Sequence, residues 1–221
     1  MFKKILSYIF PIYLHKTESD VSKVLEVTLY NGELVLDSAN TNYSYGSLQR
    51  ILRFALKQIG FDKILQMQRI LVLGVAGGSV IKTLVDEVGY CRKIVGVEID
   101  PEVIEIAHKY FDLKNIPNLK IVINDAQVFV KNNSTKYDLI IIDIFQDKEM
   151  PSFLFQREFS EDIISLLDEN GIVLFNTMKI NHEDEKRNKD LKLNYCQNKF
   201  SIIEFNNVEG SNDLFIIYKK S

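Results

Sequence analysis

Residues 70–80, ILVLGVAGGSV, join a run of branched apolar residues to a bend of glycine and alanine. The run Ile70–Leu73 predicts a buried β-strand, and the residues after the bend have helical spacing. Gly74, Gly77 and Gly78 stand between the two, where the chain must turn tightly. Such a turn lets a ligand approach main-chain N–H groups near the helix N-terminus, although turns of this kind also serve packing alone. The stretch therefore predicts one unit of a parallel α/β sheet.

Strand and helix patterns alternate from this stretch to residue 177. The expected strands are 70–74, 93–99, 119–125, 137–145 and 171–177, and the expected helices are 79–89, 101–111, 126–132 and 159–171. Apolar runs without a polar face, such as Leu139–Ile142, are typical of strands that helices cover on both sides. Residues 200–205 and 214–220 predict two further strands, antiparallel at the sheet edge. The polar residues 181–199, between residue 177 and these two strands, predict an exposed helix or a mobile lid.

The N-terminal region has a different pattern. Apolar and polar residues alternate over 24–30 and 33–37, and an Asn-Gly pair between them predicts a small β-hairpin. Residues 47–59 then place apolar side chains at helical spacing. We expect residues 1–60 to form an N-terminal segment with the hairpin and this helix, and residues 61–221 to form a Rossmann-like nucleoside-binding domain.

The composition is that of a globular protein, and its charge favours a basic partner or a small ligand. Hydrophobic residues make up 46% of the chain, and 27 Lys+Arg against 30 Asp+Glu leave a net charge of −3, which does not attract nucleic acid. Cys91 and Cys196 have neither CxxC nor Cys/His spacing, so we expect no metal site and reduced thiols in the cytoplasm. The apolar residues 1–14 are too short to span a bilayer and contain Pro11. We expect them to pack on the domain, with a secretory leader as the alternative and no membrane partner.

Acidic residues stand at the ends of the next two expected strands. Glu98 lies twenty-odd residues after Gly74, where a carboxylate can accept both hydroxyls of a ribose, and Asp125 ends the following strand. Asp100 and Asp125 could each be a helix N-cap instead. Taken together, the bend and the acids favour a ligand that contains a nucleoside. A dinucleotide is an alternative, although Ala76 interrupts the full GxGxxG pattern.

This arrangement resembles the class I S-adenosylmethionine-dependent transferases, which share the antiparallel sheet edge. More specifically, residues 24–177 resemble the polyamine aminopropyltransferases, the spermidine synthase family. The resemblance is carried by VEIDPEVIEIAHKYF at 97–111, YDLIIIDIFQD at 137–147 and FSEDIISLLDENGIVLFNT at 159–177. It implies a doubly wound, mostly parallel, class I methyltransferase-like α/β fold. It also implies S-adenosylmethionine, or its decarboxylated form, as cofactor.

The resemblance also implies roles for particular residues. The cofactor would lie on Gly74, Ala76, Gly77, Gly78, Glu98, Ile99, Asp125 and Ala126, and the acceptor on Tyr43, Tyr45 and Asp147. Asp143 would be the catalytic residue, because an amine nucleophile must lose a proton that a nearby carboxylate can accept. The alternatives are a cap after a core strand for Asp143 and ordinary packing for the two tyrosines.

Three departures from the family pattern bear on specificity. The family's GGGDGG motif has an aspartate where this chain has Gly77, its DSSDP becomes DIFQD with Gln146 at the second acid, and the glutamine expected after the hairpin's LDG has no match after Asp37. The loss at Gly77 removes a reason to prefer the decarboxylated cofactor.

The expected function is therefore a transferase that moves an aminopropyl or a methyl group to a small acceptor, most simply an amine. The alternatives are a catalytically inactive nucleoside-binding module and an NAD-dependent enzyme. Family members commonly form dimers, and the hairpin edge could pair with a second copy or be covered by residues 1–14.

Overall fold

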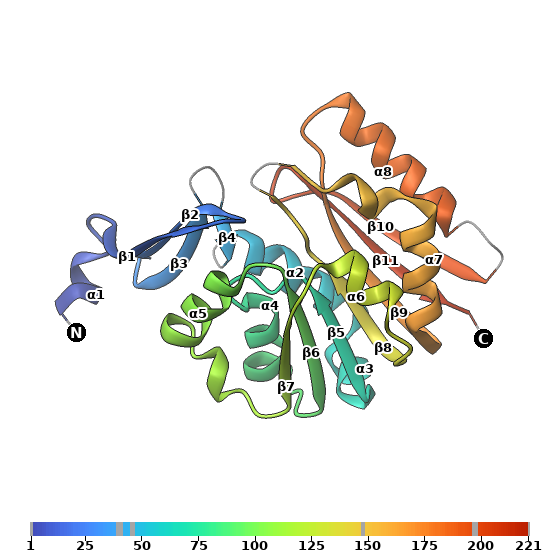
Figure 1. Cartoon of the computed structure of the whole chain (residues 1–221), viewed down its shortest axis with the longest axis horizontal. Coiled ribbons are helices and arrows are strands. Elements are labelled where there is room, and N and C mark those ends of the chain that lie inside the picture. Colours follow the sequence, from blue (N-terminus) through green and yellow to red (C-terminus); the bar gives the residue numbers. More distant parts are fainter. Residues whose placement is uncertain (1, 39–41, 45–46, 147–148, 196–198, 221) are drawn as a thin grey trace.

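The computed structural model describes residues 2–38, 42–44, 47–146, 149–195 and 199–220. Within these residues the strands form a four-stranded antiparallel sheet near the N-terminus and a seven-stranded sheet (Figure 1). The small sheet has the order β1-β2-β3-β4, formed by Ile12–Ser19, Lys23–Tyr30, Glu33–Ser38 and Asn42–Ser44. A short helix, α1 (Phe2–Leu6), precedes it.

The large sheet has the order β10-β11-β9-β8-β5-β6-β7. Its strands are β5 (Arg69–Leu73), β6 (Lys93–Glu98), β7 (Leu119–Ile123), β8 (Tyr137–Ile142), β9 (Leu167–Met178), β10 (Phe200–Val208) and β11 (Asn212–Lys219). Strands β9, β8, β5, β6 and β7 are parallel, whereas β10 and β11 run antiparallel at the edge. The predicted doubly wound sheet with an antiparallel C-terminal edge is confirmed.

Helices cover both faces of this sheet. One face carries α2 (Ser47–Ile59), α3 (Phe61–Gln66), α4 (Ser79–Lys82), the π-helix η1 (Thr83–Glu87) and α5 (Pro101–Tyr110). The other carries α6 (Ala126–Lys131), α7 (Arg157–Leu166) and α8 (His182–Asn194). The 3₁₀ turns η2 (Leu113–Asn115) and η3 (Ser152–Phe155) lie in connecting loops.

Strand β5 shows why an uninterrupted apolar run suits this position. Ile70 and Val72 pack on the face covered by α2 to α5, and Leu71 and Leu73 pack on the opposite face. Successive side chains of a strand point to opposite faces, so a strand between two helical layers must be apolar at every position. The sequence pattern at 70–73 therefore places β5 in the middle of the sheet.

The N-terminal region confirms the hairpin, as β2 and β3, but adds strand β1, which the sequence analysis missed. The expectation that residues 1–14 pack on the domain is wrong for much of the segment, because Phe2, Ile5 and Ile9 are 75%, 61% and 77% exposed. Ser7 instead ties the segment to the β2–β3 turn through hydrogen bonds with the backbone N–H groups of residues 31 and 32. Hydrogen bonds to Ser7 thus hold this segment although Phe2, Ile5 and Ile9 stay exposed.

The structure contains both the helix predicted at residues 47–59 and a helix within the polar residues 181–199. Helix α2 packs in the core of the large sheet, and the division of the chain at residue 60 stays a prediction. The polar residues 181–199 contain α8, as one of the two expectations had it, and Leu191 of this helix is buried against the sheet. No helix among the described residues is long and apolar enough to cross a membrane.

Candidate functional site

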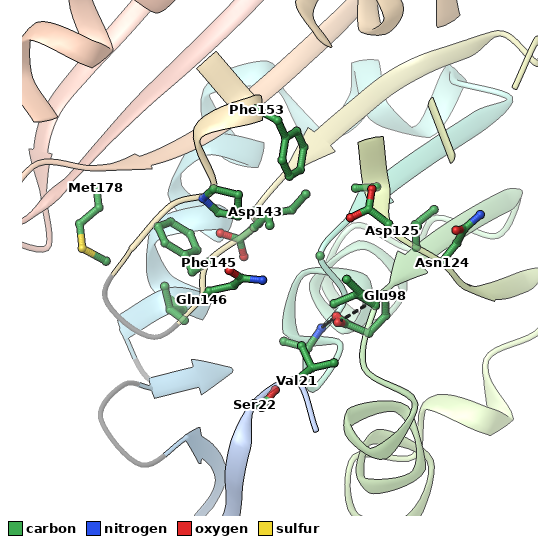
Figure 2. A pocket seen from close by; sticks show the side chains of 18 of the residues that line it. Val21, Ser22, Glu98, Asn124, Asp125, Asp143, Phe145, Gln146, Phe153 and Met178 are labelled. Atoms are coloured by element: carbon green, nitrogen blue, oxygen red, sulfur yellow. Dashed lines mark hydrogen bonds between the residues drawn. The ribbon is translucent and has the colours of Figure 1, made fainter. Parts of the chain in front are cut away.

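A cavity opens at the carboxyl ends of the parallel strands, where the chain order reverses between β5 and β8. Ligands of open α/β sheets bind at such a switch point. Gly74 follows β5, Glu98 ends β6, Asp125 lies just beyond β7 and Asp143 follows β8. All four residues line the cavity, and the three acids surround the same space (Figure 2). The fold therefore brings together acids that are far apart in the sequence.

The glycine bend is shaped mainly by contacts within the protein. Gly74 has a φ of +86°, and a Cβ on it would collide with the backbone carbonyl oxygen of Asp143. Gly78 has a φ of +80°, and a Cβ there would meet the side chain of Leu113. Neither Gly77 nor Gly78 is among the described residues that line the cavity. Close packing of the bend against the end of β8 thus accounts for the glycine at position 74.

The Glu98 carboxylate is bound by the backbone of the surrounding loops. One oxygen, Oε2, accepts hydrogen bonds from the N–H groups of Val75 and Ala76, both at 3.0 Å. The other, Oε1, accepts from Ile99 at 2.9 Å and Asp100 at 3.2 Å. Burial raises the pKa of Glu98, which is 8% exposed, and these hydrogen bonds oppose the rise. A carboxylate has about four lone-pair sites, so a sugar hydroxyl can bind Glu98 only by sharing or displacing an N–H group.

Asp125 has two features that the sequence analysis treated as alternatives. It is the N-cap of α6, where Oδ1 accepts from the Val128 N–H at 3.0 Å, and it also lines the cavity. Capping occupies one carboxylate oxygen and leaves the other for a ligand. Ile99 and Ala126 line the same part, and Ile99 is 41% exposed. This end of the cavity offers an apolar surface beside a carboxylate, which suits a purine base.

The Asp143 carboxylate lies half-buried in the cavity wall. Burial raises its pKa to about 6, and a hydrogen bond from Asn176 opposes the rise. The donor is the Asn176 side-chain Nδ2, which lies 2.8 Å from Oδ1. An acid with a pKa just below neutral is ionised at pH 7 and still binds a proton readily, which is what a general base requires.

Part of the cavity lining is apolar and was not predicted from the sequence. Phe145, Pro151, Phe153, Met178 and Leu48 contribute side chains to the cavity, together with the amides of Gln146 and Asn212. These residues come from α2, η3, the strands β9 and β11 and the loops after β8, and they form no motif along the chain. Phe145 and Gln146, two and three residues after Asp143, stand in the quoted stretch 137–147 and offered a signal.

The β1–β2 turn also reaches the cavity. Val21 and Ser22 line it, although they belong to the small sheet (Figure 2). The hydroxyls of Ser19 and Ser22 donate to one oxygen of Asp100, at 2.6 and 2.5 Å. The other Asp100 oxygen caps α5, as the N-cap alternative had it. The buried Asp100 carboxylate, which lies two residues beyond Glu98, therefore holds the β1–β2 turn at the cavity.

Three predicted acceptor-binding residues cannot be compared with the structure. Tyr45 and Asp147 lie outside the described residues, and the side chain of Tyr43, in β4, lies outside them as well. Gln146, where the family pattern has an acid, is exposed and lines the cavity.

The sequence of the chain matches one protein family. The sequence profile described as the spermine/spermidine synthase domain matches residues 53–206. A polyamine aminopropyltransferase of Vibrio vulnificus is 35% identical over 113 residues, which cover 50% of this chain and 38% of that protein. The corresponding protein of Caldicellulosiruptor bescii is 27% identical over 177 residues, 75% of this chain and 60% of its own length. The chain thus spans about two fifths of the first curated relative and three fifths of the second.

Solved structures share the fold at low identity. A probable spermidine synthase from Corynebacterium glutamicum has a TM-score of 0.72 and 16% identity, and the match covers 94% of this chain and 79% of that one. A spermidine synthase in complex with the transition-state analogue AdoDATO gives 0.70, with 16% identity over 95% and 74%. Human methyltransferase-like protein 13 in complex with SAH gives 0.64, with 20% identity over 80% and 83%.

Proposed function

Because the chain belongs to the spermine/spermidine synthase family, we propose that it transfers an aminopropyl or a methyl group to a small amine. The donor would be decarboxylated S-adenosylmethionine or S-adenosylmethionine itself. One observation carries the proposal: the half-buried Asp143 carboxylate lines a cavity that Glu98 and Asp125 also line. This arrangement combines a proton acceptor with acids suited to a nucleoside.

The residues at the β6 and β7 ends of the cavity fit the nucleoside part of such a donor. Asp125 keeps one carboxylate oxygen beyond its capping bond, and the partly exposed Ile99 side chain offers a face for a planar base. Glu98 would accept a ribose hydroxyl in exchange for one of its four backbone N–H partners. When bound, the sulfonium compound supplies an electrophilic carbon, whose bond to sulfur breaks as the acceptor nitrogen attacks.

Asp143 would prepare the acceptor for this attack. An alkylammonium ion has no free electron pair, so it must lose a proton before its nitrogen can form the new C–N bond. The Asp143 carboxylate would take that proton, and the electron pair of the broken C–S bond stays on sulfur as a neutral thioether. The apolar side chains of Phe145 and Phe153 would limit the access of water to this end of the cavity.

Ligand binding to the purified chain tests the cofactor. A thermal-shift and calorimetry panel would contain decarboxylated S-adenosylmethionine, S-adenosylmethionine, methylthioadenosine and NAD. We expect a sulfonium compound to stabilise the fold, by about 2.7 kcal/mol at a concentration one hundred times Kd. A shift with NAD alone, or with no compound, would contradict the proposal.

Turnover tests the reaction and the acceptor. The chain is mixed with each sulfonium compound and with putrescine or a set of monoamines. Release of methylthioadenosine reports aminopropyl transfer, whereas release of S-adenosylhomocysteine reports methyl transfer. Binding without either product in the whole set would favour an inactive nucleoside-binding module instead.

A further inference from the structure

Two buried asparagines connect Asp143 to strands β9 and β11. The Asn176 Nδ2 donates to Asp143 Oδ1 at 2.8 Å, and the Asn212 Nδ2 donates to Asn176 Oδ1 at 3.0 Å. Asn176 lies in β9 and Asn212 begins β11, so the three side chains cross three neighbouring strands. Asn176 is 0% exposed and Asn212 6% exposed. We call these two residues the amide pair.

Strand register explains why these side chains meet. Phe175 is paired with Ile142, so the next residues along the parallel strands, Asn176 and Asp143, lie side by side. On the antiparallel side, Leu214 is opposite Asn176, which places Asn212 at the diagonal position on the same face. Unpaired amides in this apolar core would be costly, and the contacts with each other remove that cost.

The charge on Asp143 determines the orientation of both amides. An ionised carboxylate only accepts hydrogen bonds, so Asn176 must turn its NH₂ group toward it. The Asn176 oxygen then faces Asn212, which in turn must present its own NH₂ group. No hydrogen bond to Asp143 Oδ2 is formed by the described residues. The amide pair therefore occupies one carboxylate oxygen and leaves the other.

We propose that Asn176 and Asn212 are positioning residues, which hold Asp143 through Oδ1 so that Oδ2 receives the proton of the acceptor amine. The identity of the acceptor amine in this inference rests on the proposed function. The positions of Asn176 and Asn212 follow from their hydrogen bonds alone. Asn176 acts directly on the carboxylate, and Asn212 acts through Asn176 by preventing its amide from turning over.

Other charged groups near Asp143 are few among the described residues. Glu98 and Asp125 line the same cavity from β6 and from the loop after β7. Neither contributes to the shift in the pKa of Asp143, which burial raises and Asn176 lowers. A rise in the Asp143 titration midpoint on removal of the amide pair would therefore report loss of the hydrogen bond, because loss of burial would lower the midpoint instead.

The test compares Asn176→Ala, Asn212→Ala and the wild-type chain by ¹³C NMR titration of the carboxyl carbons without ligand. The Asp143 signal is assigned with Asp143→Asn. Loss of a hydrogen bond to the charged form should raise the Asp143 titration midpoint by roughly one pH unit in Asn176→Ala. In Asn212→Ala, which keeps the direct donor, the rise should be roughly a few tenths of a unit, and Asn212→Ser should reverse part of it.

Asn194→Ala is the matched control. Its amide donates to the Phe155 carbonyl and the Ser160 hydroxyl and does not line the cavity, so the Asp143 midpoint should not change. In a transfer assay we expect a kcat about tenfold lower for Asn176→Ala, with little change in KM, because positioning of a base affects the chemical step. If Asn176→Ala does not fold, the graded pair Asn212→Ala and Asn212→Ser carries the test.

The outcomes separate the two proposals. An unchanged Asp143 midpoint in folded variants overturns the positioning role, even if the wild-type chain is an active transferase. A shifted midpoint in a chain without transferase activity supports the amide pair as a device that positions Asp143 and contradicts the proposed function.

Discussion

Glu98 and Asp143 line the same cavity but differ in the number of hydrogen bonds that their carboxylates accept from the protein. Glu98 accepts hydrogen bonds from four backbone N–H groups, whereas Asp143 accepts one from the Asn176 side chain. Burial raises the pKa of both groups. The two acids therefore differ in how many of their oxygen lone pairs accept hydrogen bonds from protein groups.

This difference indicates different tasks. The Glu98 contacts join the glycine bend after β5 to the loop after β6, so this acid holds two loops together. Asp143 accepts a hydrogen bond at one oxygen, and its second oxygen accepts none from the described residues. A carboxylate saturated by its own chain contributes to stability, and one with a free oxygen can exchange a proton.

The largest expected effect is on transfer chemistry at Asp143. Replacing Asp143 by Asn removes the proton acceptor and should lower kcat at least a hundredfold, the usual contribution of a general base being about 10² to 10⁴. The free energy of unfolding should not fall, because a desolvated charge is removed. Product release under saturating donor and acceptor measures the effect.

Asp138→Asn is the control on the same strand. Asp138 lies near the opposite end of β8, where it accepts from the N–H groups of Gln68 and Arg69. This variant should lose stability and keep its kcat. Equal activity of Asp143→Asn and the wild type would refute the role of Asp143.

Gly74 packs on the Asp143 backbone and directly precedes Val75 and Ala76, whose N–H groups bind Glu98. Gly74→Ala introduces a Cβ against the Asp143 carbonyl at a positive φ, and we expect a loss of roughly 3 kcal/mol in the free energy of unfolding. Gly89→Ala has a similar φ of +76° but open space around the new Cβ, so its loss should be about 1 kcal/mol. Urea denaturation measures both. Equal losses would mean that the contact with β8 is unimportant.

Glu98→Gln tests the structural task of the saturated acid. The glutamine NH₂ group would face two backbone N–H groups, so we expect a loss of about 2 kcal/mol in unfolding free energy. Glu105→Gln, on the exposed face of α5, should have almost no effect. If Glu98→Gln kept full stability and only weakened ligand binding, Glu98 would be a ligand group and not a link between loops.

The smallest effect is the pH dependence from Asp143. With a pKa of about 6 in the folded protein, its ionised form accumulates above that pH, so kcat should rise with pH and be half-maximal near pH 6. The unfolded chain has the lower pKa, about 3.9, so the folded protein binds this proton more tightly. Asp143 thus adds stability as pH falls from about 6 to 4, a gain that Asp143→Asn should lack. A kcat that does not change between about pH 5 and 8 would exclude Asp143 as the base.

Some of the candidate site could be predicted from local patterns. Gly74, Glu98, Asp125 and Asp143 each follow an apolar run that forms a strand, and parallel strands bring their carboxyl ends to one edge. The turn at Val21 and Ser22 carried no such signal, because its place depends on how the small sheet packs against α5. Likewise, the exposure of residues 2–10 could not be read from their apolar composition.

By itself, the sequence determined the class of fold, the alternation of strands and helices from β5 to β9 and the acids at the strand ends, because apolar runs and glycine bends act on neighbouring residues. Only the tertiary structure decided which distant side chain contacts Asp143. Asn176 and Asp143 are 33 residues apart, and Asn212 follows Asn176 after another 36. Their contact exists because β8, β9 and β11 are neighbours in one register, and hydrogen bonds of about 3 Å depend on that register.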